Sequence, residues 1–235
     1  MKYIHSVYLW IVAFVYFSFF LLFALVVSYL IKPQTYDPWL KKILRTFFKI
    51  LGIPVEVRGA EKIKPRKTYL YMSNHVSMFD IPLLGGFIPG LVRGVEAGRQ
   101  HRWPLYGWVM GRLGNIPIER EDIHQSINSF RKTKRIIEEG ISVIILPEGH
   151  RTLDGHLKPF KKLPFHLAKT IDEELVPVGL SGLFTLKRKG SWLIRPTAIK
   201  LCIGDVITRE TIDILSTSQL RDHIREKIQA LVEKP

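Results

Sequence analysis

The chain opens with a long apolar block and then alternates short apolar runs with longer amphipathic stretches. Residues 3–31 contain no Asp, Glu, Lys or Arg. Residues 8–31 alone would form a helix of about 36 Å, longer than the roughly 30 Å of hydrocarbon in a bilayer. The block predicts a transmembrane helix over about residues 8–31, within an N-terminal membrane anchor of residues 1–36. A cleaved signal peptide fits less well, because the block is long and aromatic and no small-residue cleavage site follows it.

The next segment, residues 37–51, reads DPWLKKILRTFFKIL. Its Trp, Leu, Ile and Phe residues fall at helical spacing, and its Lys and Arg residues lie mostly on the other side. A proline in the second position suits the first turn of a helix. The pattern predicts a basic amphipathic helix that lies in the membrane interface. An ordinary surface helix packed on the globular domain is the alternative.

Residues 52–235 have the pattern of a single α/β domain. Short apolar runs alternate with helical stretches, and residues 142–146 are almost continuously apolar, as in a strand covered on both faces. We expect strands at residues 55–58, 68–73, 91–95, 115–118, 141–146, 175–180 and 192–203, the last one bent or split. We expect helices at residues 79–86, 103–113, 123–139, 160–170 and 218–231. The predicted fold is a layered mixed sheet flanked by helices.

The charge balance points to an anionic partner. The formal net charge is +14, and a chain of this kind binds either nucleic acid or an anionic bilayer. We expect the lipid bilayer and no nucleic acid, because the anchor already explains the charge and no aromatic-basic nucleic-acid motif occurs. Basic residues gather after the apolar block, which favours the cytoplasmic face for the domain. The single cysteine, Cys202, excludes an intramolecular disulfide and a Cys-based zinc site, and we expect no metal.

The sharpest chemical signal is a histidine, His75, followed five residues later by an aspartate, Asp80. Neither a regular helix nor a regular strand places two such side chains together. They meet only if the chain turns between them, with a strand ending near Asn74 and a helix beginning near Ser77. The carboxylate could then hold one ring nitrogen and leave the other free as a base. A histidine that is merely hydrogen-bonded in a loop is the alternative.

Two further blocks place ionisable side chains after expected strands. Arg120 follows the strand of residues 115–118, at the kind of position where α/β folds bind ligands. A surface arginine paired with a neighbouring glutamate is its alternative. The run Pro-Glu-Gly-His-Arg, which ends at Arg151, follows the strand of residues 141–146. Glycine there permits close approach of a ligand, and the arginine fork suits a phosphate, although a structural turn with a Glu–Arg pair would look the same.

Together these blocks resemble one family. Asn-His-x-Ser-x-x-Asp, Gly-x-x-x-Ile-x-Arg, Pro-Glu-Gly-x-Arg and Val-Pro-Val occur here in the order and approximate spacing of the glycerolipid acyltransferases. The branch suggested is the bacterial-type 1-acyl-sn-glycerol-3-phosphate acyltransferases. The resemblance covers residues 54–179, about three-quarters of the expected globular domain.

The resemblance implies a reaction and a set of roles. His75 would be the general base and Asp80 would orient it. A fatty acyl group would pass from acyl-CoA or acyl-carrier protein, as co-substrate, directly to the free hydroxyl of 1-acyl-sn-glycerol-3-phosphate, giving phosphatidic acid without an acyl-enzyme or any cofactor. Arginines of the second and third blocks would bind the acceptor phosphate. The implied substrate-binding residues are Asn74, Ser77, Arg120, Glu148, Gly149 and Arg151.

Departures from the family pattern leave the acceptor open. His150 stands where the family usually has Thr. No lysine matches the one that many members use for phosphate before the Trp-Pro block, and Arg93 or Arg99 are the substitutes available. The alternative is the same chemistry on another lysolipid, such as a lyso-ornithine lipid or another lysophospholipid. More remote hypotheses are an inactive lipid-binding scaffold, a metallohydrolase, and hydrolysis of the thioester by water.

Overall fold

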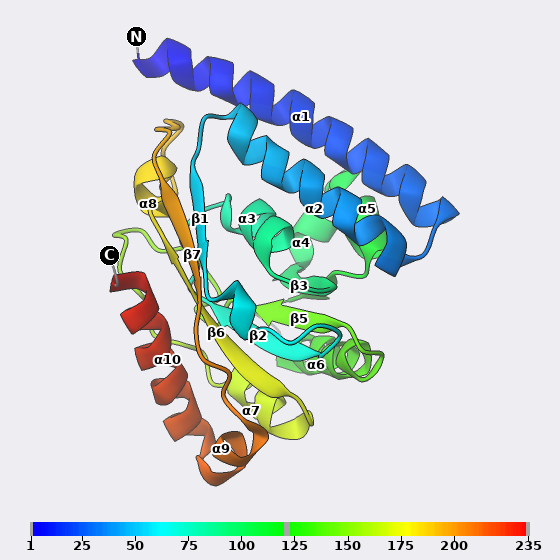
Figure 1. Cartoon of the computed structure of the whole chain (residues 1–235), viewed down its shortest axis with the longest axis vertical. Coiled ribbons are helices and arrows are strands. Elements are labelled where there is room, and N and C mark those ends of the chain that lie inside the picture. The colour runs from blue at the N-terminus through cyan, green and yellow to red at the C-terminus, as the bar shows by residue number, and fades with distance from the viewer. Residues whose placement is uncertain (1, 120–122, 234–235) are drawn as a thin grey trace.

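The computed structural model describes residues 2–119 and 123–233 (Figure 1). Within them seven strands form one sheet with helices on both faces, so the predicted layered α/β fold is confirmed. The strands are β1 (Val55–Arg58), β2 (Tyr69–Ser73), β3 (Val92–Ala97), β4 (Ile116–Ile118), β5 (Ser142–Ile145), β6 (Glu174–Ser181) and β7 (Ile199–Ile203). The helices are α1 (Lys2–Leu30), α2 (Pro33–Ile50), α3 (Asp80–Phe87), α4 (Gly98–His101), α5 (Tyr106–Leu113), α6 (Ile123–Glu138), α7 (Leu163–Thr170), α8 (Leu183–Leu186), α9 (Arg209–Ile214), α10 (Thr217–Glu233) and the 3-10 turn η1 (Ala60–Lys62).

The strand order is β1-β7-β6-β2-β5-β3-β4. Strands β6, β2, β5, β3 and β4 are parallel, whereas β7 runs antiparallel to β6 and parallel to β1. The sheet is therefore mixed, as expected. Because parallel strands end at the same edge, the segments that follow the neighbours β2 and β5 lie side by side. This edge is where α/β folds place their ligands.

The central strand β2 is buried on both faces and shows how the two cores form. Successive side chains of a strand point to opposite faces. Tyr69 and Tyr71 belong to the core beneath α1, α2 and α3, and Leu70 and Met72 belong to the core beneath α6, α7 and α10. Figure 1 shows these two helical layers on opposite sides of the sheet. The continuous apolar run of β2 thus follows from double coverage.

The C-terminal strand is shorter than expected. We expected residues 192–203 to form a strand, but only β7 is regular. Pro196 has no N–H for a ladder, and the carbonyl of Trp192 accepts a hydrogen bond from Nε1 of Trp10 at 2.7 Å instead. The turn η1 and the short helices α4, α8 and α9 were not predicted, because each has six residues or fewer and too short a repeat to recognise.

Helix α1 is long and apolar enough to cross a membrane, but one of its faces lies on the protein over its whole length. Near its start, Ser6 Oγ bonds to the backbone of Ile194. Near its end, Arg112 donates to the carbonyl of Ser28 at 3.0 Å. A helix that crossed the bilayer alone would have lipid on all sides. The single-pass span over residues 8–31 stays a prediction, and in this structure the helix also packs against the domain along one face.

Helix α2 also differs from the interfacial helix that we expected at residues 37–51. It begins earlier, and its apolar face, including Leu44 and Phe48, is buried against α1, α3 and α5. Even its basic side takes part in packing, since Arg45 donates to the carbonyl of Gly86 at 2.7 Å. The alternative, a helix packed on the domain, is the arrangement found. Most of its apolar face is covered by protein, but Trp39 and Ile50 are exposed, and contact of this helix with the membrane interface stays a prediction.

Candidate active site

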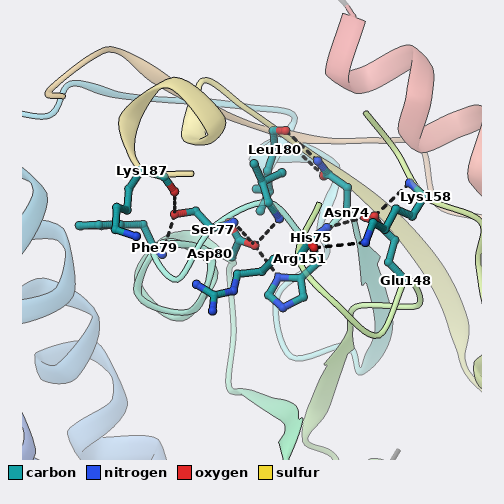
Figure 2. Close-up of polar contacts among 11 residues, drawn as sticks. Asn74, His75, Ser77, Phe79, Asp80, Glu148, Arg151, Lys158, Leu180 and Lys187 are labelled. Atoms are coloured by element: carbon teal, nitrogen blue, oxygen red, sulfur yellow. Dashed lines mark hydrogen bonds and ion pairs between the residues drawn. The ribbon is translucent and has the colours of Figure 1, made fainter. Parts of the chain in front are cut away.

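The turn between β2 and α3 brings His75 and Asp80 together. The chain leaves β2 at Ser73, and α3 begins at Asp80. His75 Nδ1 lies 2.7 Å from Asp80 Oδ2 (Figure 2). The two side chains therefore meet across a strand–turn–helix, as the five-residue spacing requires.

The Asp80 carboxylate is completely buried, and both of its oxygens accept hydrogen bonds. Besides the imidazole, it accepts the backbone N–H of Val76 at 2.7 Å and that of Ser77 at 3.0 Å. These donors fix the carboxylate, which in turn favours the tautomer with hydrogen on His75 Nδ1. No described residue bonds to Nε2, and the His75 side chain is 12% exposed. The free lone pair of Nε2 can act as a base.

Asn74 and Ser77 hold this turn in place. Asn74 exchanges two hydrogen bonds with the backbone of Leu180 in β6, at 2.9 and 2.8 Å. Ser77 Oγ donates to the carbonyl of Lys187 at 2.7 Å. Both side chains are buried. We interpret both as residues that position the turn, and because Asn74 also lines the cavity beside His75, contact with a substrate stays a prediction.

Glu148 follows β5 and supports His75 from the adjacent strand. Its Oε1 accepts the backbone N–H of His75 at 2.6 Å, and its Oε2 accepts that of Lys158 at 3.0 Å. Burial raises the pKa of Glu148 from 4.5 to about 7, against the opposing effect of the two N–H donors. Both oxygens are bonded within the protein. Glu148 therefore positions His75, and because it also lines the cavity beside His75, its contact with the acceptor stays a prediction.

Gly149 allows the chain to turn sharply after Glu148. Its φ is +75°, and a Cβ there would lie 3.0 Å from Cε of Lys161. A side chain would be strained by the backbone angle and crowded by the lysine. The turn leads to Arg151, whose side chain is half-buried, and the backbone N–H of the next residue donates to the carbonyl of His75 at 2.9 Å. No carboxylate among the described residues pairs with this guanidinium.

The comparisons with known proteins agree with this geometry. A family model described as Acyltransferase matches residues 54–181, more than half of the chain. The chain belongs to the acyltransferase family. This match includes β2, the turn with His75 and Asp80, and the Glu148–Arg151 segment.

Relatives within the acyltransferase family have consistent names. The 1-acyl-sn-glycerol-3-phosphate acyltransferase of Limnanthes alba is 36% identical over 151 residues, which are 64% of this chain and 53% of that protein. The enzyme of the same name from Cocos nucifera is 32% identical over 192 residues, or 80% and 58%. The chain thus spans little more than half the length of these relatives. The crystal structure of the 1-acyl-sn-glycerophosphate acyltransferase PlsC from Thermotoga maritima has the same fold, with a TM-score of 0.82 at 24% identity, over 97% of this chain and 93% of that one.

The arginines that the family resemblance selected lie in different surroundings in the structure. Arg120 lies outside the described residues. Arg93 is buried and donates to Asp37 of α2 and to the carbonyl of Val92, so it joins elements of the fold. Arg99 is exposed on α4. Of these candidates and Arg151, the structure brings only Arg151 to the His75 turn.

Two features of this acyltransferase site could not be read from the sequence. A cavity of about 280 Å³ lies beside the turn, and its lining combines His75 and Thr152 with Gln229 and Val232 of α10. The bond from Ser77 to the Lys187 carbonyl spans 110 positions of the chain. Neither the position of α10 at the cavity nor the bond between Ser77 and Lys187 leaves a local pattern in the sequence. Among the described residues, no cluster of three or more His, Cys, Asp or Glu side chains could hold a metal ion.

Proposed function

We propose that the chain transfers a fatty acyl group from acyl-CoA or acyl-carrier protein to the free hydroxyl of 1-acyl-sn-glycerol-3-phosphate, giving phosphatidic acid. The observation that carries the proposal is the His75–Asp80 pair, with Nδ1 bonded to a buried carboxylate and Nε2 without a hydrogen-bond partner among the described residues. The names of the relatives support lysophosphatidic acid as the acceptor. Arg151 lies next to the residue whose backbone N–H bonds to the His75 carbonyl, and it supplies a cation suited to the acceptor phosphate.

The reaction follows from these positions. Nε2 of His75 takes the proton of the acceptor hydroxyl while the hydroxyl oxygen attacks the carbonyl carbon of the thioester. The carbon–sulfur bond then breaks, and the departing thiolate receives the proton from the imidazolium. Asp80 stabilises that imidazolium. Because a thioester is already activated, one positioned base and a held acceptor supply much of the rate.

The negatively charged oxygen that forms on the thioester carbonyl needs hydrogen-bond donors from outside the start of the turn. The backbone N–H groups of His75, Val76 and Ser77 are all occupied by carboxylates. A donor from another segment would have to reach the oxyanion.

The membrane contact belongs to the outer face of α1. That face is apolar and exposed, and its members are Tyr3, Ile4, Val7, Tyr8, Ile11, Phe14, Val15, Phe19, Leu22, Val26, Tyr29 and Leu30. Since the inner face lies on the domain, we propose that α1 lies along one leaflet with its outer face in lipid. A lipid acceptor could then reach the site without its acyl chain entering water. The cytoplasmic side remains the prediction made from the basic residues.

The decisive experiment is acyl transfer by the purified full-length chain in detergent or liposomes. Acyl-CoA and acyl-carrier protein would be offered with lysophosphatidic acid and with a panel of other lysolipids. We expect transfer to lysophosphatidic acid, with at least about a hundredfold loss in His75→Ala because the base is removed. His166→Ala is the matched control, since His166 is exposed on α7, beneath the other face of the sheet.

The outcomes separate the alternatives. Transfer only to another lysolipid would retain the mechanism and change the acceptor. Thioester loss that is independent of any acceptor would indicate hydrolysis. A folded protein that transfers to nothing, or a His75→Ala variant that is as active as the wild type, would contradict the proposal.

A further inference from the structure

Lys187 is a buried cation to which no described residue supplies an anionic partner. Only 7% of the residue is exposed. Its Nζ donates to the carbonyl of Arg188 at 3.1 Å and lies 5.7 Å from the centre of the Trp10 ring. No carboxylate among the described residues forms an ion pair with it. It is thus held by one neutral acceptor and one aromatic face.

A buried ammonium group that lacks an opposite charge is energetically unfavourable. Charged groups taken out of water are normally paired, because desolvation of an unpaired charge is costly. Burial lowers the pKa of Lys187, and the positive charge of Arg151 lowers it further. Two cations therefore lie within electrostatic range of each other, and neither has a carboxylate. An anion placed between them would relieve both the burial and the repulsion.

The position of Lys187 connects it to the active-site turn. Its carbonyl accepts the hydrogen bond of Ser77 Oγ, three residues before Asp80. In Figure 2, Lys187 lies beyond Ser77 at one end of the turn, and the Arg151 side chain extends toward that end from beside His75. The contact with Trp10 places the ammonium against α1 as well. A group bound here would lie between the base and the apolar helix.

We propose that Lys187 acts with Arg151 to bind the phosphate monoester of the acceptor lysolipid. This assignment rests on the proposed function and specifies one of its binding residues. A phosphate monoester carries up to two negative charges near neutral pH, which matches two cations better than a singly charged carboxylate would. The acyl chain of the same molecule would lie toward α1. Lys187 would then select acceptors with a terminal phosphate.

The test compares Lys187→Met with Lys189→Met, which removes a lysine two positions further along the same loop. We expect K187M to raise the KM for lysophosphatidic acid by roughly ten- to a hundredfold, because one charge-assisted hydrogen bond is lost. The KM for the acyl donor and the kcat at saturating acceptor should change little. The preference for lysophosphatidic acid over 1-acylglycerol, which lacks the phosphate, should fall by the same factor. K189M should behave as wild type.

The results also distinguish the two proposals. If the wild type transfers to no phosphate-bearing lysolipid, the proposed function fails. If the wild type is active and K187M only unfolds more easily, with KM values unchanged, Lys187 merely holds its loop and this inference is overturned. A rise in the donor KM instead would overturn it too, because the anion would then be a phosphate of the donor.

A second measurement uses the wild-type protein, so its outcome does not depend on the stability of Lys187→Met. The side-chain 15N resonance of Lys187 can be assigned by its loss in Lys187→Arg. We expect it to shift on addition of lysophosphatidic acid but not of 1-acylglycerol. An equal response to both lipids, or none to either, contradicts phosphate binding.

Discussion

Two histidine–carboxylate pairs among the described residues differ in geometry, in surroundings and in their place in the fold. His75 Nδ1 lies 2.7 Å from Asp80, whereas His101 Nε2 lies 3.7 Å from Oε2 of Glu96. Asp80 accepts two backbone N–H groups and follows a central strand. Glu96 lies within β3, near the far edge of the sheet. His75 of the first pair lines a cavity, whereas the side chains of the second pair are largely buried within the protein.

The difference lies in what each carboxylate is bonded to. Glu96 accepts Nδ2 of Asn115 and the hydroxyl of Tyr106, and burial raises its pKa from 4.5 to about 7. Burial likewise lowers the pKa of His101, whose Nε2 has no hydrogen-bond partner among the described residues. Low polarity thus opposes charge on both members of this pair. Three donors around Asp80 instead hold a carboxylate that can stabilise an imidazolium.

The largest effect should come from Asp80→Asn. An amide cannot accept all three of the bonds that reach Asp80, so His75 loses its orientation and one backbone N–H loses its acceptor. We expect acyl transfer to fall by about 10²–10⁴-fold and the free energy of unfolding to fall by about 1–3 kcal/mol. Steady-state rates and chemical denaturation measure the two effects. Asp222→Asn, on the exposed face of α10, is the matched control, and unchanged activity in D80N would remove the distinction between the pairs.

Glu96→Gln should have the opposite effect on stability. The pKa of Glu96 is higher in the folded state, so the stability associated with its protonated form is present below pH 4.5 and is lost as the pH rises to about 7. The glutamine stays neutral and should stabilise the fold at pH 8 by on the order of 2–3 kcal/mol, with no gain at pH 4.5. Denaturation at the two pH values tests this. A gain that does not depend on pH would contradict the assignment to ionisation.

The smallest effect is expected for His101→Gln. Among the described residues, no hydrogen bond or ion pair joins His101 to the active-site turn, and the carboxylate 3.7 Å from its Nε2 is one that burial keeps largely protonated below pH 7. Activity should stay within about threefold of the wild type, in contrast to the loss expected for His75→Ala. Parallel rate measurements on the two variants are sufficient. A loss in H101Q comparable to that in H75A would mean that the two pairs are functionally linked.

Sequence patterns were reliable where a signal was local. The spacing of His75 and Asp80, with an apolar run before and a helix after, required a turn that brings them together. The run at residues 55–58 gave the bounds of β1. The fold class followed from the alternation of strands and helices. Short helices and the irregular residues 192–198 were missed because fewer than two turns of helix, or a strand interrupted by proline, leave no periodic pattern.

Roles that depend on distant partners were not predictable in the same way. The sequence predicted that Glu148 lies at the acceptor site, but it did not show that two backbone N–H groups from other segments bond to its oxygens. Residues 37–51 have the composition of an interfacial helix, and only α1 and α3 reveal that its apolar face is covered. Lys187 is one lysine in a basic loop until the fold buries it beside Trp10.

The sequence by itself determined the α/β layering, the family, and the pairing of a base with its carboxylate. Each of these depends on residues within a few positions of one another, or on a repeat that hydrophobic burial imposes along the chain. Only the tertiary structure decided which side chains have their hydrogen bonds satisfied within the protein and which remain free for a substrate. That outcome depends on strand order, which brings the segments after β2 and β5 together and places α1 along the domain. Contacts across a hundred positions have no local signature, because many different sequences can supply the same acceptor or the same buried surface.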